Sequence, residues 1–319
     1  ARLGFGAVMG SKRLKAVVLD GKKRIRVHDP GAMRTLTKKC NGSVPPSIPI
    51  SGGMNAMMGI LLRVLPTAMA MDGRLVLSMY RKWGTTALNQ MSIEWGDSPI
   101  KNWAGDNEDF GLGRSAQVNP DEIRKREKIK YHCYSCPLGC GGICTMEGKY
   151  RETHKPEYES VLALGGLCLN EDARSIFYLN ELLNRAGMDT ISAGATAAFA
   201  IECYENGILN EERTGGLKLN FGNADAAMEL LHQVSRGEGF GLIAGQGVRK
   251  MKKVFAENGW GDPKFMQDIG MENKGLEYSQ YVSKESLAQQ GGYAMTNKGP
   301  QHDEAWLIFM DMVNNQIPT

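Results

Sequence analysis

The residues with the greatest potential for chemistry are cysteines gathered between positions 131 and 144. Cys133, Cys136, Cys140 and Cys144 are four of the seven cysteines in the chain. The glycines and the proline between them favour a tight loop in which the sulfurs converge. Three soft thiolates spaced Cys-x-x-Cys-x-x-x-Cys suit an iron–sulfur cluster, whereas structural zinc usually draws two ligand pairs from separated segments. We therefore predict a metal site in this loop, with an iron–sulfur cluster favoured over zinc and a disulfide least favoured.

The residues leave the fourth ligand of such a cluster open. Cys144 is close enough to serve, Cys168 and Cys203 lie further along, and a ligand beyond residue 319 is a further alternative. The chain has seven cysteines, an odd number, and four of them lie in one loop. This pattern indicates a reducing compartment and not a disulfide framework.

A glycine-rich segment at the start of the chain is a second candidate binding site. Gly4, Gly6 and Gly10 allow the backbone to approach a ligand closely. Side chains that can donate hydrogen bonds to phosphate flank them: Arg2, Ser11, Lys12 and Lys15. The segment has neither the order of a Walker loop nor the strand and helix of a dinucleotide fingerprint. It predicts an anion cradle, with a purely structural turn before a strand as the alternative.

Two carboxylates and two histidines are candidates for proton transfer. Glu157 and Glu159 follow His154 closely, and they could move protons if a cleft desolvates them. A surface loop has the same composition, however, and a lone histidine such as His302 is ordinarily a surface or structural residue. These residues alone therefore indicate no particular reaction.

Helices must position most of these residues, because the apolar periodicity is helical from about residue 31 onward. The expected helices span 32–40, 54–65, 69–79, 122–130, 172–185, 192–206, 224–236 and 247–258. The Met-rich pair at 54–79 is predicted to pack in the core. Gly187 is expected to end a helix in the left-handed conformation and to leave Asp189 free to accept hydrogen bonds. The β-rich run at 16–19 is the only clear strand, so the predicted fold class is mainly α.

The composition sets outer limits on fold and partners. A chain of 319 residues with 42% hydrophobic and 23% charged residues can form two globular domains. Its 38 Lys and Arg against 35 Asp and Glu leave a net charge of +3, too small a surplus to indicate nucleic acid. Charges interrupt the apolar stretches, so no transmembrane helix is predicted. The chain starts inside a glycine-rich run and stops after an apolar stretch, which predicts a segment of a longer polypeptide.

Taken together, the motifs resemble one family, the tungsten-containing aldehyde:ferredoxin oxidoreductases with their bis-pyranopterin cofactor. The matching segments are the glycine-rich run 3–16, the three cysteines, Lys-Pro-Glu-Tyr-Glu at 155–159, the pterin motif and its continuation at 184–196, Lys-Gly-Leu-Glu at 274–277, and the run 293–302. The resemblance implies helical domains 2 and 3 of an α+β protein, preceded by a short β-rich remnant. Residues 1–30 would end the N-terminal β domain, 31–273 would form a helical domain, and 274–319 would begin the C-terminal helical domain.

The resemblance also assigns cofactor contacts. Cys133, Cys136 and Cys140 would hold a [4Fe–4S] cluster, with Cys144 as a bystander. The pterins of the tungsten cofactor, with Mg²⁺ at their phosphates, would be contacted by Arg2, Gly4, Gly6, Ala7, Gly10, Ser11, Lys12, Asn184, Gly187, Met188, Asp189, Lys274, Gly275 and Leu276.

For catalysis, the resemblance implies a substrate pocket above the metal of the cofactor, which would be tungsten or molybdenum. Glu159, with Glu157 nearby, would accept a proton, with a raised pKa, or position a water, and His302 would face Glu159 as a proton donor or substrate clamp. The reaction would oxidise an aldehyde to a carboxylic acid and pass electrons through the cluster to ferredoxin or a small iron–sulfur subunit. The enzyme would be a homo- or hetero-oligomer in the cytoplasm.

Some residues depart from the family pattern. Asn184 stands where the pterin motif usually has aspartate, and Tyr178 stands where some members carry a glutamate for a subunit-bridging iron, so that metal is not expected. The residues at 299–304 also differ from the commoner sequence around the histidine. Two alternatives follow: a low-potential aromatic-ring (benzoyl-CoA-type) reductase subunit acting on an acyl thioester, or a non-catalytic iron–sulfur electron-transfer subunit.

Overall fold

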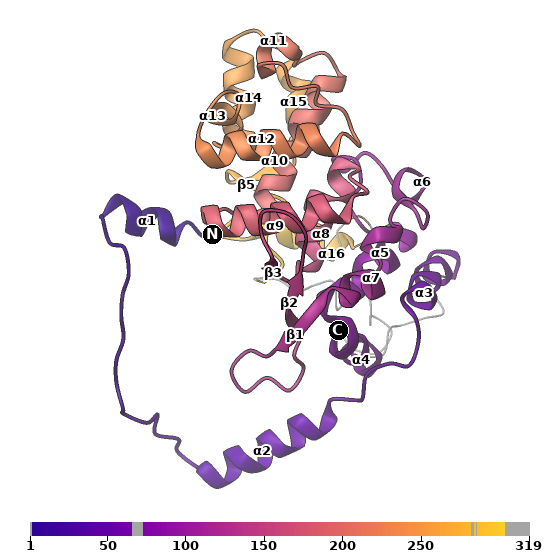
Figure 1. Cartoon of the computed structure of the whole chain (residues 1–319), viewed down its shortest axis with the longest axis vertical. Coiled ribbons are helices and arrows are strands. Elements are labelled where there is room, and N and C mark those ends of the chain that lie inside the picture. Colours follow the sequence, from indigo (N-terminus) through magenta and orange to yellow (C-terminus); the bar gives the residue numbers. More distant parts are fainter. Residues whose placement is uncertain (1, 66–72, 282–283, 285, 304–319) are drawn as a thin grey trace.

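The computed structural model describes residues 2–65, 73–281, 284 and 286–303. Helices dominate the structure (Figure 1), which confirms the mainly α fold class. Among the described residues, no helix is both long and apolar enough to cross a membrane.

The N-terminal segment lies largely outside the helical body (Figure 1). It contains α1 (Phe5–Ser11) and α2 (Pro30–Ser43), neither of which buries a residue. The strand predicted at 16–19 is wrong, because residues 14–27 form neither helix nor strand. A strand needs a hydrogen-bonding neighbour, and here Val18 and Leu19 are 88% and 91% exposed, with no described strand beside them.

The next helices form one side of the body. They are α3 (Gly52–Val64), α4 (Gly73–Trp83), η1 (Gly84–Leu88), α5 (Asn89–Trp95), α6 (Asn107–Phe110), η2 (Ala116–Val118) and α7 (Pro120–Lys125). The prediction that the Met-rich pair packs in the core holds only in part. Met79 of α4 is fully buried, whereas Met54 and Met57 of α3 are more than half exposed. Residues 66–72 of this pair lie outside the described residues.

A three-stranded antiparallel sheet carries the cysteine loop. Its strands are β1 (Glu127–Tyr131), β2 (Gly141–Thr145) and β3 (Glu152–His154), in that order. The helix predicted at 122–130 is therefore wrong beyond Lys125. Ile129 pairs with Ile143, and Tyr131 with Gly141, so pairing with β2 overrides the helical preference of the Glu and Lys residues.

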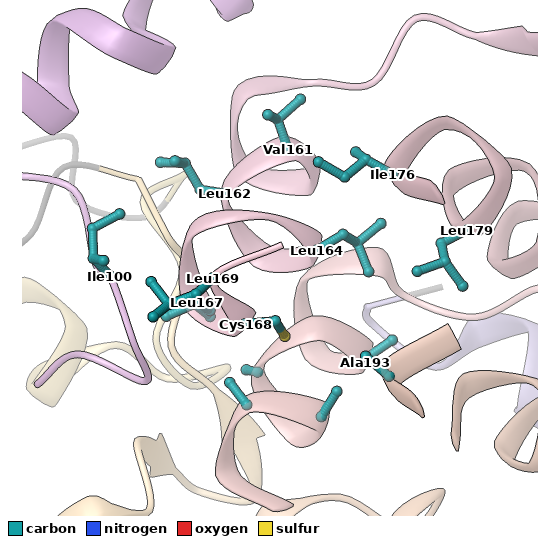
Figure 2. Packing of buried hydrophobic residues seen from close by; sticks show 14 of the residues in the cluster. Ile100, Val161, Leu162, Leu164, Leu167, Cys168, Leu169, Ile176, Leu179 and Ala193 are labelled. Atoms are coloured by element: carbon teal, nitrogen blue, oxygen red, sulfur yellow. The ribbon is translucent and has the colours of Figure 1, made fainter. Parts of the chain in front are cut away.

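The centre of the core is built on α8 (Tyr158–Leu164), η3 (Gly166–Cys168), α9 (Ala173–Ala186) and α10 (Thr190–Glu205). Figure 2 shows Cys168 among apolar side chains that include Leu164, Leu167 and Ala193. α10 crosses α8 so closely that a Cβ on Gly194 would lie 2.4 Å from the carbonyl oxygen of Ala163. This crossing fixes α8, which carries Glu159.

The remaining elements cover α10 and return the chain to α8. They are α11 (Glu211–Thr214), α12 (Ala224–Arg236), α13 (Gly241–Ala244), α14 (Val248–Glu257), α15 (Pro263–Ile269), β4 (Glu272–Asn273), β5 (Leu276–Glu277) and α16 (Leu287–Met295). β4 and β5 form a tight hairpin whose turn is Lys274–Gly275, both with positive φ. The segment after this hairpin runs beside α8 and brings Ser279 and His302 to Glu159.

Candidate active site and cofactor cleft

Glu159 and His302 lie in contact, although they are far apart in the sequence. His302 Nδ1 is 3.1 Å from Glu159 Oε1, and the hydroxyl of Ser279 donates a hydrogen bond to the same carboxylate oxygen. The preceding residue anchors Glu159, because the fully buried Tyr158 places its hydroxyl 3.0 Å from Ser92 Oγ. The structure therefore brings together the two residues that were predicted to face each other. Their catalytic role stays a prediction.

The electrostatics of Glu159 differ from expectation. Burial favours the neutral acid and acts to raise the pKa of Glu159. The hydrogen bond and charge of His302, the hydroxyl of Ser279 and the charge of Arg2 outweigh that effect and lower the pKa. The predicted raised pKa is therefore wrong, because the contacts of Ser279 and Arg2 with this site were not foreseen and the effect of the expected His302 contact on the pKa was not counted against burial. Glu159 is held as a carboxylate, the form that accepts a proton.

Two tyrosines that the sequence analysis missed complete this site. The ring of Tyr281 stacks on His302 with 4.6 Å between centroids and 18° between planes. The Tyr281 hydroxyl is 3.0 Å from that of Tyr80 on α4. Burial is the main reason that the pKa of each tyrosine is raised, so both are neutral hydrogen-bonding groups at neutral pH. No local motif marks them, since only the fold places them beside the histidine.

Glu157 points to a different neighbourhood from Glu159. Its side chain is open to solvent on one side, and desolvation by the surrounding protein raises its pKa. The Thr85 hydroxyl donates a hydrogen bond to Glu157, and Lys155 nearby opposes the rise. The negative charge of Glu157 in turn raises the pKa of Cys140, after burial as the main cause. Glu157 therefore lies between the acid–histidine pair and the cysteine loop.

The hairpin cysteines, Cys133, Cys136 and Cys140, lie in the loop between β1 and β2. The Cys136 amide donates to the Cys133 carbonyl at 3.0 Å, and the pKa of Cys140 responds to the charges of the other two. Their chemistry suits an iron–sulfur cluster. Among the residues described, however, no three Cys, His, Asp or Glu side chains gather closely enough to hold a metal ion. The structure thus places the three thiols in one loop without converging them, and the cluster stays a prediction.

The other cysteines near this sheet are core residues. Cys144 is fully buried on β2, and burial raises its pKa to about 12. Cys168 is buried in η3, and burial raises its pKa to about 12 as well. Both sulfurs belong to the hydrophobic core, whereas the three hairpin cysteines are exposed or half-buried. This favours Cys144 as a bystander.

A cofactor-sized cleft of about 320 Å³ lies between the start of α10, the α13–α14 turn and the β4–β5 hairpin. Its lining includes the predicted pterin residues Arg2, Gly187, Met188, Asp189, Gly275 and Leu276. Gly187 ends α9 with φ of 70°, and Asp189 caps α10 by accepting from the Ser192 amide at 2.9 Å. The prediction that Gly187 ends the helix and presents Asp189 is confirmed.

Arg2 connects this cleft to the acid–histidine pair. Its guanidinium lies 3.0 Å from Asp189 Oδ2 and donates to the carbonyls of Glu277 at 2.5 Å and Pro300 at 2.9 Å. Its Nε is buried without a hydrogen-bond partner among the described residues. A carboxylate acceptor, an unused guanidinium donor and glycine corners fit the edge of a pterin ring and its oxygens.

Other predicted cofactor residues lie elsewhere in the structure. The Asn184 amide donates to Asn180 on its own helix, and Lys274 Nζ donates to the Thr296 carbonyl. The remaining predicted contacts lie on or beside α1, outside the lining of the cleft: Gly4, Gly6, Ala7, Gly10, Ser11 and Lys12. The structure does not bring them to the cleft, because the segment forms a helix that leaves the body directly after Arg2.

One departure from the family pattern has a clear structural counterpart. The hydroxyl of Tyr178 is 3.0 Å from His232 Nε2, and its ring stacks on that of Tyr150 with centroids 5.4 Å apart. Tyr178 supplies no carboxylate at the position where a bridging iron would need one.

The helical body joins an acid–histidine pair to a cleft lined by Asp189 and Glu277, with a three-cysteine hairpin alongside, an arrangement that suits a protein in which a bound cofactor carries out the chemistry. Residues 68–319 match the family described as aldehyde ferredoxin oxidoreductase, domains 2 and 3. The chain belongs to this family, and the resemblance predicted from its motifs is confirmed.

Individual relatives agree with this assignment. A tungsten-containing aldehyde ferredoxin oxidoreductase of Pyrococcus horikoshii is 31% identical and matches 96% of this chain and 45% of its own length. A WOR-like subunit of an aliphatic sulfonate oxidoreductase from Pyrococcus furiosus is 28% identical over 80% of this chain. The chain spans about half the length of the aldehyde ferredoxin oxidoreductases it matches.

A solved structure supports the fold. The active-site complex BamBC of benzoyl coenzyme A reductase, bound to 1,5-dienoyl-CoA, aligns with a TM-score of 0.59 over 87% of this chain and 38% of its own. The sequence identity is 24%, so this likeness concerns the fold alone.

Proposed function

We propose that this chain is the central part of a tungsten or molybdenum bis-pyranopterin oxidoreductase that oxidises an aldehyde to a carboxylic acid. The observation that carries the proposal is the joint placement of two sites. Arg2 contacts Asp189 in the cofactor cleft and also holds the Pro300 carbonyl, two residues before His302. His302 in turn contacts Glu159. A group bound in the cleft would therefore lie next to an acid–base pair.

The cofactor would supply the two-electron chemistry when bound, and the protein would supply binding and proton transfer. Asp189 and Arg2 would bind the pterin, with Gly187, Met188, Gly275 and Leu276 as close backbone contacts. Mg²⁺ would bind at the pterin phosphates, and the glycine-rich segment would contact the same phosphates.

In the reaction, Glu159 accepts a proton from the attacking water, because its lowered pKa keeps it ionised at neutral pH. His302 donates a hydrogen bond toward the aldehyde oxygen as charge develops there. Tyr281, stacked on the imidazole, holds the ring plane. Ser279 donates to Glu159 and fixes the orientation of the carboxylate.

The hairpin cysteines would bind the [4Fe–4S] cluster and pass electrons outward to ferredoxin or a small iron–sulfur subunit. Their loop suits this role because Cys133 is exposed, while Cys140 lies near Glu157. Two matched proteins are a WOR-like subunit and the active-site complex BamBC, which supports a homo- or hetero-oligomer. The protein would reside in a reducing cytoplasm. Its domain boundaries would fall after residues 30 and 273.

Metal analysis and turnover of the full-length enzyme test this function. We expect tungsten or molybdenum together with iron, and aldehyde-dependent reduction of a viologen dye. Glu159→Gln should lower kcat by about 100-fold with unchanged metal content, because the amide cannot accept the proton. The matched control is Glu122→Gln, an exposed carboxylate on α7.

Three outcomes would count against the proposal. Iron without tungsten or molybdenum would favour a non-catalytic electron carrier. Reduction of an aromatic acyl thioester without any aldehyde oxidation would favour the benzoyl-CoA-type reductase. Unchanged turnover in a fully metallated Glu159→Gln enzyme would refute the role of Glu159.

A further inference from the structure

A second cleft, of about 520 Å³, lies between the loop after α5, the end of α15 and the segment leading into α16. It shares no lining residue with the cofactor cleft. Its lining residues are Asn102, Trp103, Ala104, Glu202, Asp268, Ile269, Met271, Tyr278, Lys284, Gln290 and Tyr293. The proposed oxidoreductase mechanism uses none of these side chains.

Three aromatic rings form one wall of this cleft. Trp103 and Tyr278 meet edge to face with centroids 5.9 Å apart, and Tyr278 meets Tyr293 in the same manner at 5.7 Å. Such rings offer apolar faces and edges to another planar ring. A dry cavity of about 150 Å³ is enough for benzene, so the cleft has room for a substituted aromatic molecule.

The indole N–H of Trp103 has no hydrogen-bond partner among the described residues, and its nitrogen is buried. An unpaired buried donor is costly, because it has lost water without gaining an acceptor. The side chain that carries this donor lines the cleft. A ligand oxygen would supply the missing acceptor.

The backbone that presents Trp103 is strained. Lys101, Asn102 and Trp103 are consecutive non-glycine residues with φ of 49°, 46° and 76°. Left-handed conformations of this kind persist only where surrounding contacts enforce them, and they concentrate at functional sites. Here the Lys101 and Asn102 amides donate to the carbonyls of Gly166 and Leu167, both at 3.0 Å. The core thus forces the turn that directs Trp103 to the cleft.

A carboxyl group provides the second polar contact. Glu202 of α10 accepts from Asn102 Nδ2 through Oε2 at 2.5 Å. Burial raises its pKa, against the opposing effects of Asn102 and Lys101. Asp268 also lines the cleft, but its carboxylate is paired with Lys264 at 2.9 Å, so Glu202 is the acidic group that disfavours an anionic ligand. The ammonium of Lys284, also in the lining, is directed to the Gly105 carbonyl at 2.6 Å.

We propose that this cleft binds a small hydroxyaromatic molecule of the phenol type. Its ring would pack against Trp103 and Tyr278, and its hydroxyl would accept from the Trp103 indole and donate to Glu202. A hydroxyl is suited to this pair of contacts, because one oxygen can both accept and donate. An ammonium group would satisfy the Glu202 carboxylate but leave the indole N–H unpaired. A carboxylate would satisfy the indole but face Glu202.

The test is a titration of the full-length enzyme with phenol, followed by calorimetry and tryptophan fluorescence. We expect saturable binding at one site. Anisole, whose ether oxygen accepts but cannot donate, should bind about tenfold more weakly, as should benzoate and benzylamine. Trp103→Phe keeps a ring and removes the N–H donor, and it should lower the affinity for phenol by about tenfold. Trp95→Phe, outside the cleft, is the matched control and should bind phenol normally.

Changes at Glu202 give a second, independent test. Glu202→Leu should lower the affinity for phenol by about tenfold. Glu202→Gln retains an acceptor oxygen and should keep most of the wild-type affinity. Equal binding of phenol and anisole would overturn the proposal, as would unchanged phenol affinity in a folded Trp103→Phe enzyme. Preferential binding of benzylamine would instead identify a cation site. Failure of aldehyde oxidation would leave these binding results unaffected.

Discussion

Replacing Arg2 should loosen the segment that carries His302. The guanidinium makes an ion pair with Asp189 and two hydrogen bonds to the carbonyls of Glu277 and Pro300. At about 1 kcal/mol for each contact, Arg2→Met removes roughly 3 kcal/mol of local stability. Because 1.4 kcal/mol corresponds to a factor of ten, opening of this segment should become roughly 150-fold more frequent.

Hydrogen exchange measured by mass spectrometry on the full-length enzyme reports this opening directly. The most informative peptide contains Ser279, whose amide donates to the Pro300 carbonyl at 3.3 Å. Arg2→Lys keeps the charge but loses the planar fork, so an intermediate increase in exchange is expected. Arg174→Met is the matched control, since its ion pair with Asp172 is exposed and contributes little. Exchange at Ser279 that stays at the wild-type rate in Arg2→Met would refute the reasoning.

Three further predictions follow from the same contacts. Alanine at any one hairpin cysteine should abolish the absorption band of the iron–sulfur cluster, while Cys144→Ala should retain it. Loss of the band in Cys144→Ala would reverse the assignment of that thiol. The lowered pKa of Glu159 means that its ionised form stabilises the folded protein above the usual carboxyl range, and that this contribution is lost as pH falls through the lowered pKa. The difference in urea midpoint between wild type and Glu159→Gln should therefore shrink on acidification, and a difference that grows would contradict the sign. Gly194→Ala should destabilise the fold by about 1–3 kcal/mol, because the new methyl meets the Ala163 carbonyl at 2.4 Å; Gly291→Ala, with open space around it, is the control in the same denaturation assay.

The sequence by itself determined several of the longer helices and the local motifs. The helix predicted at 224–236 matches α12 residue for residue, and the one predicted at 172–185 is bounded by Asp172 and Gly187 as α9. Apolar periodicity and end caps are local signals, so these predictions needed no tertiary information. The collinear motifs also sufficed to identify the family.

Only the tertiary structure decided what lies beside what. β1 forms because β2 pairs with it, although its residues alone favoured a helix. Tyr281 reaches His302, and Arg2 and Ser279 reach the surroundings of Glu159, through contacts between segments remote in the sequence. These partners reverse the direction of the pKa shift that burial alone would give Glu159. Charge state and site geometry depend on three-dimensional neighbours, and those are fixed by packing of the whole chain.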